Sequence, residues 1–185
     1  MVPMKKITAV LIVLFVAFGF SACEKDDICD ADTPTTPRLV IQFYNSTGVL
    51  KNVTNLKAVA EGMDTGVILN ETGTEITRYL SNGNQIELPL DLTKDKVTYY
   101  LSLNATDTTL IKTDTIEFNY DRKTLYVSRA CGYKTLFNLN NLPGIPRAFV
   151  LNGNNVPQIG NWINSVIVEK YNLESENETH IKIIF

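Results

Sequence analysis

Short runs of alternating apolar and polar residues follow one another from Arg38 to the end of the chain. In the clearest of them, Val97–Asn104, the residues Val, Tyr, Leu and Leu alternate with Thr, Tyr, Ser and Asn. Successive side chains of a β-strand point to opposite faces, so a period of two predicts a strand with one buried face. Similar runs, rich in Val, Ile, Thr, Tyr and Phe, predict strands at Arg38–Tyr44, Val53–Ala60, Glu75–Leu80, Gln85–Leu90, Leu110–Tyr120, Thr124–Arg129, Tyr133–Leu139, Arg147–Leu151, Trp162–Leu173 and Thr179–Phe185.

The segments between these runs are rich in Asn, Gly, Asp and Pro, which favour turns. Ser81–Asn84 contains Asn-Gly, the pair preferred in tight hairpin turns, and predicts a hairpin between the strands on either side of it. The polar run Tyr120–Lys123 predicts a break between two strands, and the last two strands are expected to form a terminal hairpin. Residues 38–185 are therefore expected to form one all-β domain, an antiparallel β-sandwich of immunoglobulin-like or related Greek-key type. A small β-barrel is the alternative.

Residues 1–22 have a different pattern, in which Lys5 and Lys6 precede the apolar run Ile7–Phe20 and small residues follow it. A helix of these 14 residues would be about 21 Å long. That is less than the roughly 30 Å hydrocarbon core of a bilayer. A basic start, a short apolar run and small residues at its end are typical of a secretory signal peptide. We therefore expect residues 1–22 to be cleaved from the chain.

The last positions of this segment, Phe20-Ser-Ala-Cys23, resemble a lipobox, although Phe20 replaces the usual Leu or Val. The resemblance implies diacylation of the Cys23 thiol, cleavage before this residue and acylation of the new amine. Two or three acyl chains would anchor the protein stably to a membrane. An ordinary signal peptide that happens to end near a cysteine is the alternative.

Residues 23–37 are expected to be the lipidated cysteine and an acidic, Pro-rich tether, because Pro34 and Pro37 disfavour a helix. Within it, Lys25, Asp26 and Asp27 resemble the export signal that follows the lipidated cysteine in surface lipoproteins of the Bacteroidetes. The resemblance implies an outer-membrane, cell-surface location. A periplasm-facing protein with a simply hydrated acidic tether is the alternative.

Two cysteines, Cys29 and Cys131, remain once Cys23 carries lipid. An exported chain is oxidised, so we expect these two to form a disulfide, with two unrelated thiols as the alternative. In the chain-entropy model, closing a loop over their separation of 102 residues would stabilise the fold by about 4.7 kcal/mol. The bridge would also hold the start of the domain near the membrane tether.

The formal charge of the chain is −3, and loss of the signal peptide removes two lysines and no acid. The chain has no basic stripe of the kind that binds nucleic acid, so no nucleic-acid partner is expected. Its single histidine, His180, is expected on the polar, exposed side of the last strand beside Lys182. One histidine excludes a multi-histidine zinc site, and no Gly-x-Ser-x-Gly, His-Glu-x-x-His or phosphate-loop motif occurs. No catalytic residue, metal or cofactor is predicted, and the protein is not expected to be an enzyme.

Aromatic and threonine residues carry the remaining hypotheses. Tyr99 and Tyr100 must face opposite sides of one strand, and Trp162 stands where an Asn/Gly-rich loop enters a strand, so these rings are candidates for stacking on a sugar. The favoured interpretation is that Trp162 and one tyrosine belong to the core, because amphipathic rings fit the edge of a sandwich. Thr108 and Thr115, each preceded by an aspartate, resemble threonine O-glycosylation signals of exported proteins of the Bacteroidetes.

Several segments together resemble an uncharacterised lipoprotein family of Flavobacteria-type Bacteroidetes, the domain-of-unknown-function family 6452. They are Cys23–Cys29, Thr33–Tyr44, Ala130–Tyr133 and His180–Phe185. The resemblance implies the exported compartment and supports a Cys29–Cys131 pair, and it brings no catalytic residues.

Two functions are carried forward from the sequence. The first is a non-enzymatic, lipid-anchored binding or structural accessory protein of the envelope, whose partner would be an outer-membrane β-barrel or another envelope protein. The second is a glycan-binding module of a surface uptake system.

Overall fold

A computed structural model describes residues 28–30, 32–33, 35–141, 147–153 and 160–185. The chain divides into two compact units. The first contains the described residues before Pro34 together with Tyr126–Tyr133, and the second contains Pro34–Leu125 and Lys134–Phe185. Residues 1–22, expected to be a signal peptide, lie outside the described residues. Within the described part of the chain, no helix has the length and apolar character needed to cross a membrane.

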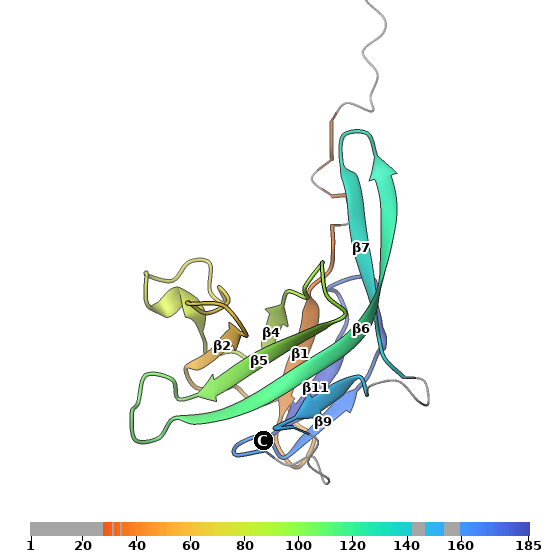
Figure 1. Cartoon of the computed structure of the whole chain (residues 1–185). Helices are drawn as coiled ribbons and strands as arrows, with labels where there is room; N and C mark the ends of the chain where they lie inside the picture. Colours follow the sequence, from red (N-terminus) through yellow and green to blue (C-terminus); the bar gives the residue numbers. More distant parts are fainter. Residues whose placement is uncertain (1–27, 31, 34, 142–146, 154–159) are drawn as a thin grey trace, which may run out of the picture. The chain divides into compact units, whose positions relative to one another are not determined.

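The chain is nearly all β, and its strands form two sheets that do not close into a barrel (Figure 1). The smaller sheet has the order β4-β1-β11-β9, in which β1 and β11 are parallel and the other pairs antiparallel. The larger has the order β10-β7-β6-β5-β2-β3, with β8 paired to β6. The bounds of the smaller sheet are β1 Leu39–Tyr44, β4 Gln85–Leu88, β9 Ser165–Val168 and β11 Ile181–Ile184. Those of the larger are β2 Leu56–Ala60, β3 Leu80–Ser81, β5 Lys96–Leu103, β6 Lys112–Ser128, β7 Gly132–Leu139, β8 Phe149–Leu151 and β10 Asn172–Leu173.

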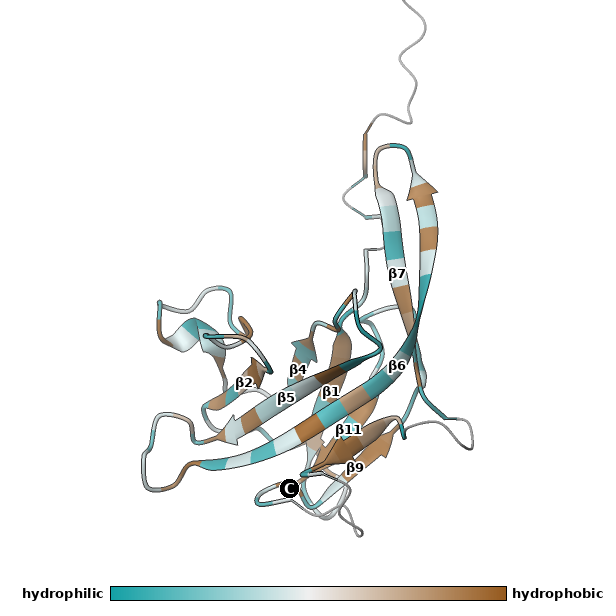
Figure 2. Ribbon diagram, in the orientation of Figure 1, coloured by the Kyte–Doolittle hydropathy of each residue, from teal (hydrophilic) through white to brown (hydrophobic). Residues whose placement is uncertain are grey.

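One hydrophobic core contains side chains from both sheets, as expected of a β-sandwich. Alternate residues of β1, namely Leu39, Ile41 and Phe43, are buried there. Tyr99 and Leu101 of β5 are buried in the same cluster, so the alternation in the sequence places the correct faces inward. The same alternation of hydrophobic and hydrophilic positions can be followed along β6 (Figure 2). The expected sandwich is confirmed, and the barrel alternative is wrong.

The hairpin expected around Ser81–Asn84 is wrong, because the strands before and after it belong to different sheets. β3 pairs with β2, whereas β4 pairs with β1. Neither Asn82 nor Gly83 is among the described residues with positive φ, so the turn that favours Asn-Gly does not form. The Asn82 side chain instead accepts a hydrogen bond from the Asn55 backbone N–H. Most of the strand expected at Glu75–Leu80 is likewise absent, with a 3-10 turn η2 at Thr77–Tyr79.

The break expected at Tyr120–Lys123 is also wrong, since β6 runs without interruption for 17 residues. Tyr120 is buried, and its hydroxyl both accepts from the backbone N–H of Asp91 and donates to the Asp91 carbonyl. Arg122 forms an ion pair with Asp95 at 2.8 Å. The polar run therefore has partners in the loop between β4 and β5 and needs no turn.

The C-terminal region agrees with the expected hairpin only in part. β9 and β11 are antiparallel neighbours, but the segment expected to be one strand, Trp162–Leu173, is divided between β9 and β10. β9 belongs to the smaller sheet, whereas β10 pairs with β7 in the larger one. The sequence predicts antiparallel strands, and the parallel pairing of β1 with β11 differs from that prediction.

Candidate functional site

The first candidate site lies in the smaller unit, where a disulfide joins Cys29 to Cys131 with their Cα atoms 5.0 Å apart. The expected pairing is confirmed. The turn beside it is shaped by Gly132, which has a φ of +69°, and by Ser128, whose hydroxyl accepts a hydrogen bond from the Cys131 backbone N–H at 3.0 Å. The disulfide therefore ties the segment before the first strand to the tip of the β6–β7 hairpin.

Exposed apolar side chains stand near both cysteines in the sequence. Tyr126 and Tyr133, on the two strands of the hairpin, are 59% and 71% exposed. Their rings pack edge to face with centroids 5.4 Å apart. Ile28, next to Cys29, is 82% exposed. We call Ile28, Tyr126 and Tyr133 the apolar tip.

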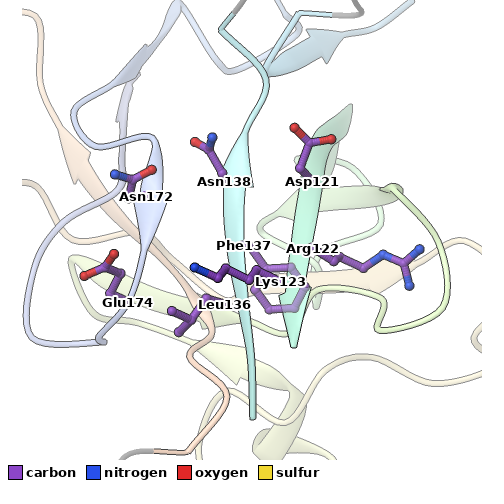
Figure 3. Close-up of a pocket in the computed structure, with 8 residues that line it drawn as sticks. All are labelled: Asp121, Arg122, Lys123, Leu136, Phe137, Asn138, Asn172 and Glu174. Carbon is purple, nitrogen blue, oxygen red and sulfur yellow. The ribbon is translucent and has the colours of Figure 1, made fainter. Parts of the chain in front are cut away.

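The second candidate site, in the larger unit, is a groove of about 310 Å³ on the outer side of β10, β7 and β6. Asn172, Asn138 and Asp121 lie side by side on these three neighbouring strands (Figure 3). The pairing of Asn172 with Asn138 in the antiparallel register sets this row. The lining residues are Asp121, Arg122, Lys123, Leu136, Phe137, Asn138, Asn172 and Glu174.

A second groove of about 490 Å³ adjoins the first, because Asn138, Asn172 and Glu174 line both. It adds Tyr171, which is partly exposed, and Lys170, which forms an ion pair with Glu178. We call the two together the amide groove. Each asparagine amide offers both donors and an acceptor, a combination that suits a ligand rich in hydroxyl groups.

Two of the aromatic residues singled out in the sequence lie in the core and not at a site. Trp162 is 7% exposed, and its indole N–H donates to the Leu101 carbonyl at 2.9 Å. Tyr99 is buried and its hydroxyl donates to the Pro89 carbonyl. This placement agrees with the interpretation that Trp162 and one tyrosine, Tyr99, are core residues. It does not agree with a role for these two rings in stacking on a sugar. Tyr100 is 39% exposed but lies outside the amide groove.

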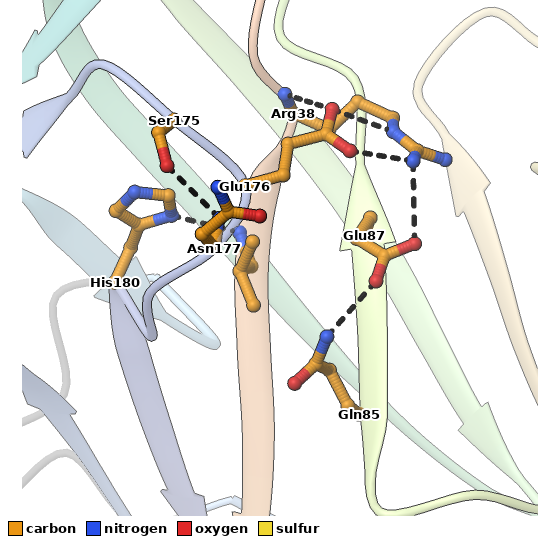
Figure 4. Close-up of polar contacts among 8 residues, drawn as sticks. Arg38, Gln85, Glu87, Ser175, Glu176, Asn177 and His180 are labelled. Atoms are coloured by element: carbon orange, nitrogen blue, oxygen red, sulfur yellow. Dashed lines mark hydrogen bonds and ion pairs between the residues drawn. The ribbon is translucent and has the colours of Figure 1, made fainter.

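His180 was expected on an exposed face and is instead fully buried, so that expectation is wrong. The turn that precedes the last strand folds over this face of the strand (Figure 4). The Nδ1 atom of His180 accepts a hydrogen bond from the Val40 backbone N–H at 3.0 Å, which places the proton of the neutral ring on Nε2. Among the described residues, the buried Nε2 atom has no hydrogen-bond partner of good geometry. The Ser175 backbone nevertheless acts to raise the pKa of His180, because it favours the charged ring. Burial lowers the pKa of His180 to about 4, and the positive charge of Lys170 acts in the same direction.

The same turn is held by an ion pair at its other side. The Arg38 guanidinium donates to both carboxylate oxygens of Glu176, at 2.9 and 2.6 Å, and the Arg38 backbone N–H donates to one of them (Figure 4). Glu87 lies 3.4 Å from the same guanidinium. The hydrogen bond from Arg38 holds the pKa of Glu176 below its usual value. His180 and this pair therefore fasten the turn and leave no imidazole exposed for proton transfer.

The remaining residues singled out in the sequence do not come together. Cys23, Lys25, Asp26 and Asp27 lie outside the described residues. Thr108 is exposed in the loop between β5 and β6, whereas Thr115 is partly buried within β6. In the part of the chain that the structure describes, no three His, Cys, Asp or Glu side chains gather as a metal site.

Neither candidate site was found from the sequence. Most of the groove residues are ordinary polar residues of three strands and the segments beside them, and Asp121 and Asn172 are 51 positions apart in the chain. They come together because β10, β7 and β6 are neighbours in the larger sheet, and the sequence did not predict the pairing of β10 with β7. The apolar tip left a weak signal, since Tyr133 follows Cys131 closely in the sequence.

Comparison with known proteins adds a family without an assigned role. The model of a family of unknown function, DUF6452, matches residues 55–185. No curated protein and no solved structure matches the chain.

Proposed function

Because the chain belongs to DUF6452, a family of unknown function, we propose its role from its own residues: a lipid-anchored, non-enzymatic binding or accessory protein of the outer membrane and cell surface. The observation that carries the proposal is the Cys29–Cys131 disulfide. Such a bond forms in oxidising compartments outside the cytoplasm and is rare inside it. It supports an exported chain, which the signal-like residues 1–22 also indicate.

The position of the disulfide determines how close an anchor at Cys23 would hold the domain to the membrane. Cys29 follows Cys23 by six positions, a length of chain that reaches about 21 Å when fully extended. An acylated Cys23 would therefore hold the protein close to the bilayer. Short tethers of this kind suit a protein that acts on neighbouring envelope components, because both partners then stay in one thin layer.

A labelling experiment tests the proposal. Cells that express the full chain are grown with radiolabelled palmitate, and the protein is purified from membranes. We expect the label in the unaltered chain and in Lys25→Ala, the matched control, and its loss in Cys23→Ala. An unlabelled chain, or a Cys23→Ala variant that stays tightly membrane-bound, would overturn the proposal. Protease treatment of intact cells then tests surface exposure, with digestion expected for the unaltered chain and protection for a variant that lacks Lys25, Asp26 and Asp27.

The amide groove favours a second candidate function, the binding of a glycan. The side chains of Asn138 and Asn172 form no hydrogen bond with any other described residue, so both amides are available to sugar hydroxyls. Tyr171 at the edge of the groove offers a ring for stacking. A glycan array probed with the full chain, Asn138→Ala and Asn172→Ala tests this function. Signals that the two variants lose and Tyr100→Ala keeps would support it, and equal signals from all four proteins would exclude the groove.

A further inference from the structure

The apolar tip is exposed in the described part of its own unit. Ile28, Tyr126 and Tyr133 are all more than half exposed, and the two tyrosines contact each other edge to face. Exposed apolar side chains gathered at one place are typical of a surface that another phase or molecule covers. The chain connectivity at this point indicates what covers it.

Covalent bonds limit the distance between the tip and the residue expected to carry lipid. Cys29 lies at most about 21 Å along the chain from Cys23. The disulfide then places the Cα of Cys131 5.0 Å from that of Cys29. If Cys23 is acylated, the tip of the hairpin cannot move away from the bilayer surface by more than these two lengths together.

We propose that the apolar tip inserts into the headgroup region of the membrane that holds the acyl chains, so that the protein contacts the bilayer at a second point formed by Tyr126, Tyr133 and Ile28. This inference rests on the proposed lipid anchor at Cys23. Tyrosine is enriched at membrane interfaces because its ring is apolar and its hydroxyl is polar. The anchor and the tip together fix which end of the hairpin faces the lipid.

Size favours a lipid surface over a protein partner. A stable protein interface buries about 800 Å² on each partner and involves some 20–30 residues. The tip offers three apolar side chains, and each aromatic ring can bury only about 150–250 Å². Such a small patch gives little affinity by itself. It is sufficient where an anchor already holds it at high local concentration beside the bilayer.

Charge selects the kind of lipid. Residues 24–32 contain five acidic residues and a single lysine, so anionic headgroups repel this segment. Arg129 at the hairpin turn and Lys134 beside Tyr133 carry the opposite charge and partly offset this repulsion. With charges of both signs around the tip, the attraction is assigned to its apolar side chains, and the surface that it fits is a zwitterionic one. We expect the contact to persist at high salt, because it does not depend on ion pairs.

Quenching by brominated lipid tests the inference. Tyr133→Trp and, as the matched control, Tyr100→Trp are made in the full chain, purified in the acylated form from membranes and reconstituted in phosphatidylcholine vesicles with or without bromine near the headgroups. The buried Trp162 supplies a constant signal in both. We expect bromine to remove about half of the emission of Tyr133→Trp, because one of its two tryptophans would lie in the interface. Little change is expected for Tyr100→Trp or the unaltered chain.

The outcomes separate this inference from the proposed function. Vesicle-bound Tyr133→Trp that bromine does not quench, or equal quenching of both variants, would overturn the tip contact and leave the anchor standing. A chain that fails to float with the vesicles and carries no acyl group would overturn both. Tyr126→Trp provides a second reporter if circular dichroism shows that Tyr133→Trp is misfolded, and the same criteria apply to it.

Discussion

Asp114 accepts a hydrogen bond from the backbone N–H of Trp162 at 2.9 Å, across 48 residues of chain. The same buried carboxylate accepts from the backbone N–H groups of Asn161 and Ile163 and from the Asn152 side chain. Gly160 packs so closely against it that a Cβ there would lie 2.5 Å from its oxygens. One side chain of β6 thus shapes the loop that delivers Trp162 to the core.

The first prediction follows from this arrangement. Asp114→Asn keeps the shape of the side chain but places an NH₂ group against N–H donors, so buried donors lose their acceptor. We expect the free energy of unfolding to fall by about 2–4 kcal/mol. Urea unfolding followed by circular dichroism measures it. Asp121→Asn, an exposed acid of the same strand, is the control and should change stability by less than about 0.5 kcal/mol. Equal effects of the two substitutions would contradict this role of Asp114.

The second prediction concerns pH. Burial lowers the pKa of His180 from 6.5 to about 4, so the unfolded chain binds a proton at a pH where the folded chain does not. The contribution of neutral His180 to the free energy of unfolding is therefore fully present above pH 6.5. It falls as the pH drops from 6.5 to about 4, and below pH 4 it changes no further. The loss can reach about 3 kcal/mol. Because His180 is the single histidine, NMR titration of its imidazole protons reads the pKa directly. A midpoint near 6.5 would show that the ring is not buried.

The third prediction concerns the disulfide. Cys29→Ser/Cys131→Ser should lower the free energy of unfolding by up to about 4–5 kcal/mol, because the bridge closes a loop across 102 residues. Chemical unfolding with and without reductant measures the effect, and reductant should change the unaltered chain but not the double variant. An unchanged unfolding midpoint in the double variant would show that the smaller unit opens without affecting the larger one.

Much of the fold could be predicted because local pattern decides it. The alternation in Val97–Asn104 placed Tyr99 and Leu101 in the core, and that in Arg38–Tyr44 placed Phe43 there. These faces depend only on the period of a strand. Cysteine count together with an export signal was enough to predict the Cys29–Cys131 pair.

The features that were missed depend on contacts between distant segments. The polar residues at 120–123 resemble a turn in the sequence, because the hydrogen bond between Tyr120 and Asp91 joins segments that are far apart in the chain. His180 directly precedes β11 in a pattern that predicts an exposed side chain, and it is buried because a turn, fastened by Arg38, covers it. The amide groove depends on the pairing of β10 with β7 in the larger sheet. Periodicity carries no information on any of these contacts.

The last prediction uses two charges of opposite sign that act on His180. Lys170 lowers the pKa of the imidazole, and Glu176 raises it. Lys170→Gln removes a positive charge, which makes the protonated ring easier to form, so the pKa of His180 should rise from about 4. Glu176→Gln removes a negative charge and should lower it further.

NMR titration of the imidazole in the two variants measures both shifts. Lys182→Gln, two residues along the chain from His180, is the matched control with the smallest expected change, because this lysine is not among the charges that shift the pKa of the ring. Glu176→Gln also loses the two-pronged bond to Arg38, which is worth about 1 kcal/mol at a partly exposed site. A looser turn alone would hydrate the imidazole and raise its pKa. A fall of the pKa in Glu176→Gln therefore identifies charge as the cause, whereas a rise would show that the ion pair acts by keeping the turn closed over the ring.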